Sequence, residues 1–170
     1  YIYIMVEIRY ASRKDVSVIL QFIKELAEYE KEPLAVEATE AILEESIFDK
    51  KQANVILLEE NNESVGFALY FFNFSTWRGK AGLYLEDLYV RPQYRGKGYG
   101  KMLLSYLANQ AVEQGCPRFE WIVLDWNKPS IDFYKAMGAK PLDEWTVFRL
   151  ENEKLQTLAK SYRTSCGLEG

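Results

Sequence analysis

Apolar and polar positions alternate in several short stretches of the chain, and each stretch predicts a β-strand. Three of them follow one another closely, at Asn54–Glu60, Ser64–Phe74 and Ala81–Val90. Short turns join them, so we expect the last two to pair as an antiparallel hairpin. Val6–Tyr10 predicts one more short strand near the start of the chain.

Apolar residues recur every three or four positions in two longer stretches, which predicts two amphipathic helices. The first begins at Val16 and ends before Pro33, and the second spans Gly98–Gln114. Shorter helices are predicted after the N-cap residue Thr39, over Pro129–Met137 behind the N-cap residue Asn127, and over Glu153–Lys160.

Strands and helices mix along the chain, which predicts the α/β class. A strand at Arg118–Leu124 follows the long second helix, and this strand–helix–strand unit should be parallel and right-handed. A last strand or hairpin is expected at about Ala139–Leu150. We therefore expect a single domain over residues 4–150, with residues 151–170 forming a C-terminal helix and a loose tail.

The composition is that of one globular domain. The chain has 170 residues, 48% hydrophobic content and a mean hydropathy of −0.25. No apolar run approaches the ~20 residues of a membrane span, so we expect no membrane partner. A net charge of −4 argues against a nucleic-acid partner and favours a small cationic substrate.

The chain contains no histidine. This excludes histidine bases, histidine triads and histidine metal sites, so proton transfer must use carboxylates, tyrosine, amines or water. The two cysteines, Cys116 and Cys166, form no Cys-x-x-Cys motif. We therefore expect no metal site, and two reduced thiols in a cytoplasmic protein.

A glycine-rich turn joins the strand ending at Val90 to the long second helix. Its glycines lie at alternate positions, namely Gly96, Gly98 and Gly100. Glycine lets the backbone approach a ligand closely, and the helix N-terminus supplies free N–H groups, so this turn suits a phosphate. Arg95 and Lys101 add positive charge. A P-loop is excluded because Met102 replaces the Ser or Thr, and Lys101 replaces the third glycine of a dinucleotide site.

Two adjacent carboxylates, Glu86 and Asp87, interrupt an apolar strand. The period of a strand predicts that they point to opposite faces. Each is either solvated, paired with Arg or Lys, or part of a functional site, since a buried lone charge is costly. Tyr134 lies two turns into the helix that Asn127 caps, and taken alone it is typical of a core aromatic residue.

Together these segments resemble the GNAT superfamily of N-acetyltransferases. Arg95-Gly96-Lys97-Gly98-Tyr99-Gly100 matches its Arg/Gln-x-x-Gly-x-Gly/Ala motif. Other segments are similar to the spermidine/spermine N-acetyltransferase subfamily with its thialysine-acetylating branch: Lys24–Glu30, Phe67–Phe71, Tyr84–Asp87, Asp125–Ser130 and Phe133–Tyr134. The resemblance implies the GNAT fold, a mixed six- to seven-stranded sheet flanked by helices, with splayed parallel central strands.

The resemblance also implies acetyl transfer from acetyl-CoA to a primary amine of a small polyamine, diamine or lysine-like (thialysine) acceptor. Glu86, through a water, would be the base and Tyr134 the general acid. Acetyl-CoA would contact Leu88, Tyr89, Val90, Arg95, Gly96, Lys97, Gly98, Tyr99, Gly100, Lys101, Asn127, Lys128, Pro129 and Ser130. The amine would contact Tyr29, Glu30, Glu86, Asp87, Glu120, Trp121, Ile122 and Glu144. Members of the family usually form homodimers.

Two alternatives remain within the same fold. One is an enzyme that acetylates a protein or peptide amine, or the amine of an antibiotic. The other is a non-catalytic module that binds acetyl-CoA. Asp125-Trp126-Asn127 is closer to the thialysine branch than to the polyamine branch, which bears on the choice of acceptor.

Overall fold

Five strands form one mixed sheet in the computed structural model, which describes residues 3–167. Their bounds are β1 Val6–Tyr10, β2 Asn54–Glu60, β3 Glu63–Ser75, β4 Lys80–Val90 and β5 Phe119–Glu120. They lie in the order β1-β2-β3-β4-β5; the first four are antiparallel neighbours, and β4 pairs with β5 in parallel. The predicted mixed α/β class is confirmed.

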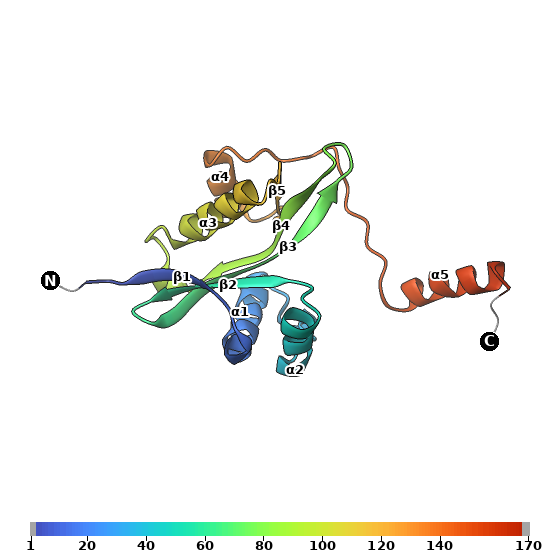
Figure 1. Ribbon diagram of the computed structural model, residues 1–170, viewed down its shortest axis with the longest axis horizontal. Coiled ribbons are helices and arrows are strands. Elements are labelled where there is room, and N and C mark those ends of the chain that lie inside the picture. Colours follow the sequence, from blue (N-terminus) through green and yellow to red (C-terminus); the bar gives the residue numbers. More distant parts are fainter. Residues whose placement is uncertain (1–2, 168–170) are drawn as a thin grey trace. The chain divides into compact units, whose positions relative to one another are not determined.

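The described residues form five helices and four short helical turns. Their bounds are α1 Val16–Tyr29, α2 Glu40–Glu44, α3 Tyr99–Glu113, α4 Lys128–Ala136 and α5 Asn152–Ser165, with short turns at η1 Arg13–Asp15, η2 Pro33–Ala35, η3 Glu45–Asp49 and η4 Pro92–Tyr94. Figure 1 shows α1 and α2 on one face and α3 on the other. The chain divides into two compact units, one up to Ile122 and one from Val123 onward, so α4 and α5 belong to the second unit.

The helices of the first unit bury the apolar stripes that the spacing predicts. Ile19 and Phe22 of α1 are fully buried, and the Phe22 ring stacks on Phe67 of β3 with 5.4 Å between centroids. Leu103 and Leu107 of α3 are also fully buried. Each such side chain contributes about 2 kcal/mol by leaving water, so the two helices hold the sheet between them.

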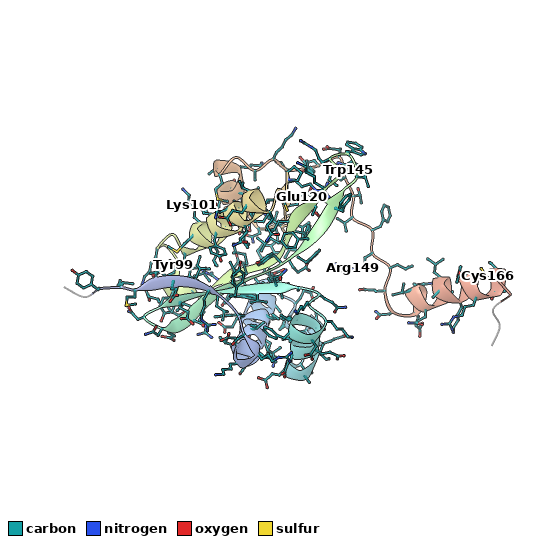
Figure 2. All side chains as sticks on the ribbon, viewed as in Figure 1. Tyr99, Lys101, Glu120, Trp145, Arg149 and Cys166 are labelled. Atoms are coloured by element: carbon teal, nitrogen blue, oxygen red, sulfur yellow. The ribbon has the colours of Figure 1, made fainter. Side chains whose placement is uncertain are left out.

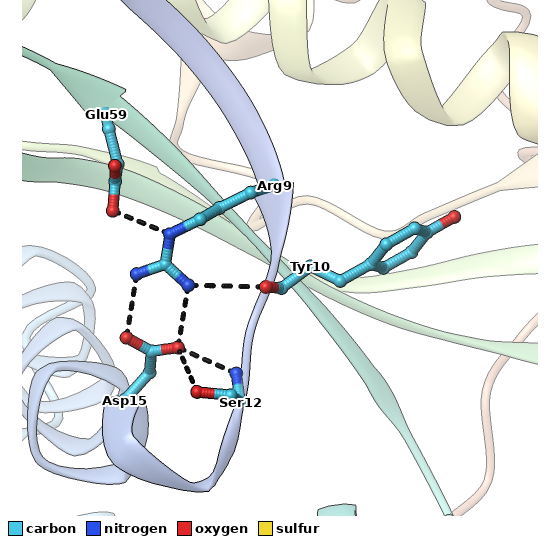
Figure 3. A network of polar contacts seen from close by, with 5 residues as sticks. All are labelled: Arg9, Tyr10, Ser12, Asp15 and Glu59. Atoms are coloured by element: carbon cyan, nitrogen blue, oxygen red, sulfur yellow. Dashed lines mark hydrogen bonds and ion pairs between the residues drawn. The ribbon is translucent and has the colours of Figure 1, made fainter. Parts of the chain in front are cut away.

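Arg9 of β1 connects the edge of the sheet to the start of α1 (Figure 3). Its Nε donates to Glu59 Oε1 at 2.7 Å, and its two Nη atoms donate to the Asp15 carboxylate at 2.8 Å each. The guanidinium, together with the Ser12 N–H, lowers the pKa of Asp15 to about 2. The network fixes where α1 begins relative to β1 and β2.

Most elements match the sequence predictions. The strand at Asn54–Glu60 has the predicted bounds, and α3 is the helix expected at Gly98–Gln114. Thr39 caps α2 through its side chain, which accepts from the Ile42 N–H at 3.2 Å. The C-terminal helix is confirmed as α5, which is longer than expected.

Two strand predictions are wrong. The strand expected at Arg118–Leu124 is limited to β5, and no strand forms within 139–150 in the described part of the chain. Pro141 lacks the N–H that a ladder needs, and a turn closed by Trp145 N and Leu142 O at 3.2 Å interrupts the extended chain. The sheet of the described residues therefore has five strands, not six or seven.

The predicted domain limits, residues 4–150, stay a prediction. Of the expected loose tail, residues 168–170 lie outside the described residues.

Candidate active site

A β-bulge in β4 places the two adjacent carboxylates. Leu69 of β3 lies opposite Asp87, and the next residue, Tyr70, lies opposite Leu85, so Glu86 is the extra residue of β4. The simple alternation expected for the two acids does not hold across this bulge, because one residue has no cross-strand partner. Glu86 is exposed, whereas the Asp87 side chain is largely buried.

Asp87 belongs to a cluster of three acids from two elements. Burial, with the charges of Glu86 and Glu30, raises the pKa of Asp87 from 3.8 to about 7. Burial and the charge of Glu86 also raise the pKa of Glu30, which follows the last residue of α1. The sequence placed Glu30, Glu86 and Asp87 in one site, and the structure brings them into electrostatic contact. A cation would relieve their mutual repulsion.

Glu120 of β5 pairs with Tyr84 of β4. Burial, together with the charges of Glu86 and Glu120, raises the pKa of the Tyr84 phenol, so both acids lie near this ring. Glu120 also forms an ion pair with Arg118, with 3.1 Å between Oε1 and Nε. Arg118 partly neutralises the charge of Glu120. In this respect Glu120 differs from the cluster of Glu30, Glu86 and Asp87.

Within residues 3–167, no strand pairs with one edge of β4 beyond Tyr84. β5 pairs with Leu83 and Tyr84 only. On the other edge, the register with β3 and the bond from Arg91 N to Val65 O set the alternation of the hydrogen bonds. This alternation directs the N–H and C=O groups of Leu88 and Val90 away from β3. An extended ligand can therefore add to β4 at these two residues, as the resemblance implies for the pantetheine arm.

The glycine turn presents main-chain N–H groups to open space. Gly96 and Gly98 have φ of 79° and 82°, which side-chain-bearing residues rarely adopt, and a Cβ at either would meet no atom within 4 Å. Gly98 is the N-cap of α3 and supplies no capping side chain. The first N–H groups of α3 therefore have no acceptor within the helix. Figure 2 labels the side chains of Tyr99 and Lys101 in this first turn. This geometry fits a diphosphate.

The basic side chains of the turn hold the turn itself in place. Arg91 binds both carboxylate oxygens of Glu25 on α1 at 3.2 Å. Lys97 Nζ lies 2.8 Å from Glu60 of β2, which also accepts from the Tyr99 hydroxyl. Lys97, one of the residues that the resemblance assigns to acetyl-CoA, is thus already paired within the protein. No sequence signal could show these contacts, because each partner lies more than 30 residues away.

The second unit carries the other predicted residues around α4. The Asn127 side chain accepts from the Ser130 N–H at 3.4 Å and so caps α4, as predicted. Pro129 lies in the first turn, where its missing N–H costs nothing. Lys128 Nζ binds Asp132 at 2.5 Å. Tyr134 is half-buried, and its ring lies 5.8 Å from that of Phe133.

The other residues that are predicted to contact the amine differ in their surroundings. Trp121 packs edge-on against Phe119 with 4.9 Å between ring centroids. Ile122 is exposed at the end of the first unit, and Glu144 is exposed in the extended segment of the second unit. Their part in a site stays a prediction.

The described residues offer no metal site and no membrane-spanning helix. No group of three or more carboxylates or cysteines there has a geometry able to hold a metal ion. No helix among residues 3–167 has the length and apolar character needed to cross a bilayer.

Comparisons with known proteins identify the fold. The model of the Acetyltransferase (GNAT) family matches residues 19–139. Bovine thialysine N-epsilon-acetyltransferase is 40% identical over 166 residues, covering 91% of this chain and 97% of the relative. Human spermidine/spermine N(1)-acetyltransferase-like protein 1 is 36% identical over 90% of this chain and 24% of that protein. An integron cassette protein of V. cholerae superposes with a TM-score of 0.77 at 30% identity, covering 91% and 98% of the two chains.

A β4 edge without a paired strand, beside a glycine turn at an uncapped helix start, suits an extended ligand that ends in a diphosphate. The chain belongs to the Acetyltransferase (GNAT) family, and it is an N-acetyltransferase. Enzymes of this family use acetyl-CoA, which fits the turn and the open edge.

Replacing Asp87 by Asn tests the burial of its carboxyl group. Its pKa is about 7 in the folded chain and 3.8 ordinarily, so the folded state binds an extra proton between these values. The contribution of this group to the unfolding free energy is therefore complete below about pH 4 and is lost as the pH rises to about 7. Asp87→Asn should remove that loss and raise the unfolding free energy at pH 8 by up to about 4 kcal/mol, measured by urea unfolding.

Asp143→Asn is the matched control, since Asp143 is an exposed carboxylate in the extended segment. It should leave the pH dependence of unfolding unchanged. If Asp87→Asn keeps the slope of the parent protein between about pH 4 and pH 7, Asp87 is not a buried, proton-binding carboxyl.

Proposed function

We propose that this enzyme acetylates the primary amine of a small cation, a thialysine-like amino acid, a diamine or a polyamine. The observation that carries the proposal is the cluster of Glu30, Glu86 and Asp87 on β4 and the end of α1. These acids surround the bulge that precedes the open β4 edge, so they suit a positively charged acceptor. The relatives named for thialysine support the same class of acceptor.

The acceptor must lose a proton before it can attack. An alkyl amine with a pKa of about 10.4 is neutral in only about one molecule in 2,500 at pH 7, which costs about 4.6 kcal/mol. Glu86 is exposed at the bulge and is the base that we propose, acting through a water. The raised pKa of its neighbour Asp87 means that this carboxyl can hold a proton near neutral pH.

Tyr134 is the general acid in this proposal. A phenol, with an ordinary pKa near 10, can give its proton to a thiolate leaving group with an ordinary pKa near 8.5. Tyr134 lies on α4, whose start is fixed by the Asn127 cap. The support for its role is the resemblance of Phe133–Tyr134 and of the capping segment to the subfamily.

Acetyl-CoA supplies the thioester when bound. In our proposal the N–H groups of Gly96–Lys101 bind its diphosphate, and Leu88–Val90 bind its pantetheine arm as an added strand. The segment Asn127–Ser130 contributes the rest of the channel. The turn is suited to this because its glycines leave space and α3 has no capping side chain.

The amine contacts in the proposal are those that the subfamily resemblance supplies. They are Tyr29, Glu30, Glu86, Asp87, Glu120, Trp121, Ile122 and Glu144. Of these contacts, the best supported are those of Glu30, Glu86 and Asp87. The charges of these three acids interact, and all three lie in the first unit.

The enzyme is also proposed to be a cytoplasmic homodimer. Cys116 and Cys166 are both free, which fits a reducing compartment. Phe74 and Trp77 on the β3–β4 hairpin are exposed, Trp77 at 92%, and a second copy of the chain would cover such aromatic surface.

A panel of amines tests the acceptor. Thiol release from acetyl-CoA should be fastest with thialysine, lysine, putrescine, spermidine or spermine, and slow with an uncharged amine, a peptide or an aminoglycoside. The kcat/KM for the preferred amine should fall as salt rises, because the acids attract a cation. A preference for the peptide or the aminoglycoside would overturn the proposal in favour of the alternative acceptor.

Substitutions of the proposed base and acid test the mechanism. Tyr134→Phe should lower kcat by about 100-fold while coenzyme A still binds, because only proton donation is lost. Glu86→Gln should move the pH–rate profile to higher pH, since the amine must then lose its proton to solvent. An unchanged kcat for the first variant, or an unchanged profile for the second, would contradict the assigned role.

Light scattering of the purified chain tests the dimer. We expect a mass twice that of one chain, and a mass of about 19.8 kDa would contradict it. Trp77→Ser should weaken the association if the hairpin lies in the interface.

A further inference from the structure

The Arg95 side chain is held by three neutral groups. Its Nε donates to the main-chain oxygen of Val90 at 2.9 Å. Its guanidinium carbon lies 5.2 Å from the ring centroid of Tyr29 and 5.6 Å from that of Tyr89. A planar cation over aromatic faces is attracted by their ring electrons, so the side chain is fixed on two sides at once.

These contacts join three parts of the first unit. Arg95 directly precedes Gly96, where the turn first adopts a positive φ. Val90 and Tyr89 end β4, and Tyr29 is the last residue of α1. One side chain thus connects the start of the glycine turn to the strand before it and to the helix across the sheet.

The hydrogen bond from Arg95 to the Val90 carbonyl also limits which main-chain groups of the open β4 edge can bind a ligand. The carbonyl of Val90 faces the same side as the main-chain groups of Leu88, and Arg95 occupies it. An added strand can therefore pair with Leu88 and with the Val90 N–H, and the turn begins directly beyond. Arg95 sets the distance between the part of the site that suits an extended arm and the part that suits a diphosphate.

The contact between Arg95 and Tyr29 lies next to the acid cluster in the chain. Glu30 follows Tyr29, and the charge of Glu86 acts on Glu30. The residue whose ring contacts Arg95 and an acid of the cluster are therefore neighbours at the same end of α1.

We propose that Arg95 is a positioning residue that couples the acetyl-CoA turn to the acceptor end of α1, with the Tyr29 ring as its platform. The inference rests on the proposed function, in which the turn binds acetyl-CoA and the acids bind the amine. It predicts that Tyr29, a residue on the acceptor side, contributes to coenzyme A affinity through its ring rather than through its hydroxyl.

Calorimetric binding of coenzyme A to full-length variants tests this coupling. Arg95→Met should raise Kd about tenfold, because one hydrogen bond and two ring contacts are lost. Arg95→Lys, which keeps the charge but cannot stack as a plane, should raise it less. Tyr29→Leu should raise Kd about fivefold, Tyr29→Phe should leave Kd unchanged, and Arg95→Met with Tyr29→Leu should bind no worse than Arg95→Met alone.

Kinetics give a second measurement. Arg95→Met should raise KM for acetyl-CoA and KM for the amine, with kcat within about twofold, because binding geometry and not proton transfer is changed. Arg78→Met, which removes an exposed cation at the hairpin tip, is the matched control and should change neither constant. Thermal unfolding of each variant distinguishes a loss of binding from a loss of folding.

Either of two results would overturn the inference. One is a Kd that Arg95→Met leaves unchanged. The other is a Kd that Tyr29→Phe raises as much as Tyr29→Leu, which would assign the effect to the hydroxyl. If the parent protein acetylates no small amine, the proposed acceptor class fails, while the coenzyme A binding series still decides the role of Arg95.

Discussion

Leu85–Val90 of β4 have a hydrogen-bonded neighbour, β3, along one edge, and in the described chain no strand pairs with their other edge because β5 ends at Glu120. Everything proposed for the site depends on this asymmetry. The bulge at Glu86 changes the alternation by one residue, so Leu88 and Val90 present their main-chain groups to the open edge. At this bulge Glu86 is exposed, where the proposed reaction needs a solvated base, and Asp87 beside it is more deeply buried.

The charges of the glycine turn explain how an acidic protein can hold an anionic ligand. Arg91 is neutralised by Glu25 and Lys97 by Glu60, while Arg95 contacts neutral groups. The side chains therefore determine the shape of the turn, and the attraction for a phosphate comes from helix N–H groups, which carry partial charge at any pH. Three other acids, Glu30, Glu86 and Asp87, lie together near the bulge, where we propose that the cationic acceptor binds. In this proposal the first unit uses different groups for the anion and for the cation.

The sequence predicts well those features that depend on residues close together in the chain. The α3 helix follows from apolar spacing and from Gly98, and the Asn127 cap follows from its position before Pro129. Prediction from the sequence fails where the local structure depends on a residue far away in the chain. Ala139–Leu150 has apolar residues typical of a strand, but alternation marks only an extended backbone and does not supply a partner. The relation of Glu86 to Asp87 depends on a bulge against β3, and a strand pattern carries no signal for that insertion. The family motif found the turn, but the partners of its cations are non-local.

In the proposed reaction, the acid cluster would couple binding of the amine to release of a proton. Asp87 keeps a proton near pH 7 because burial and the charges of Glu86 and Glu30 oppose its ionisation. A bound ammonium group adds a positive charge among these acids, and this charge lowers the pKa of Asp87 again. By linkage, a cation that favours ionised Asp87 binds more tightly as the pH rises through this range. The same rise favours removal of the proton from the amine, so in the proposed reaction binding and activation of the acceptor improve together on the alkaline side of neutrality.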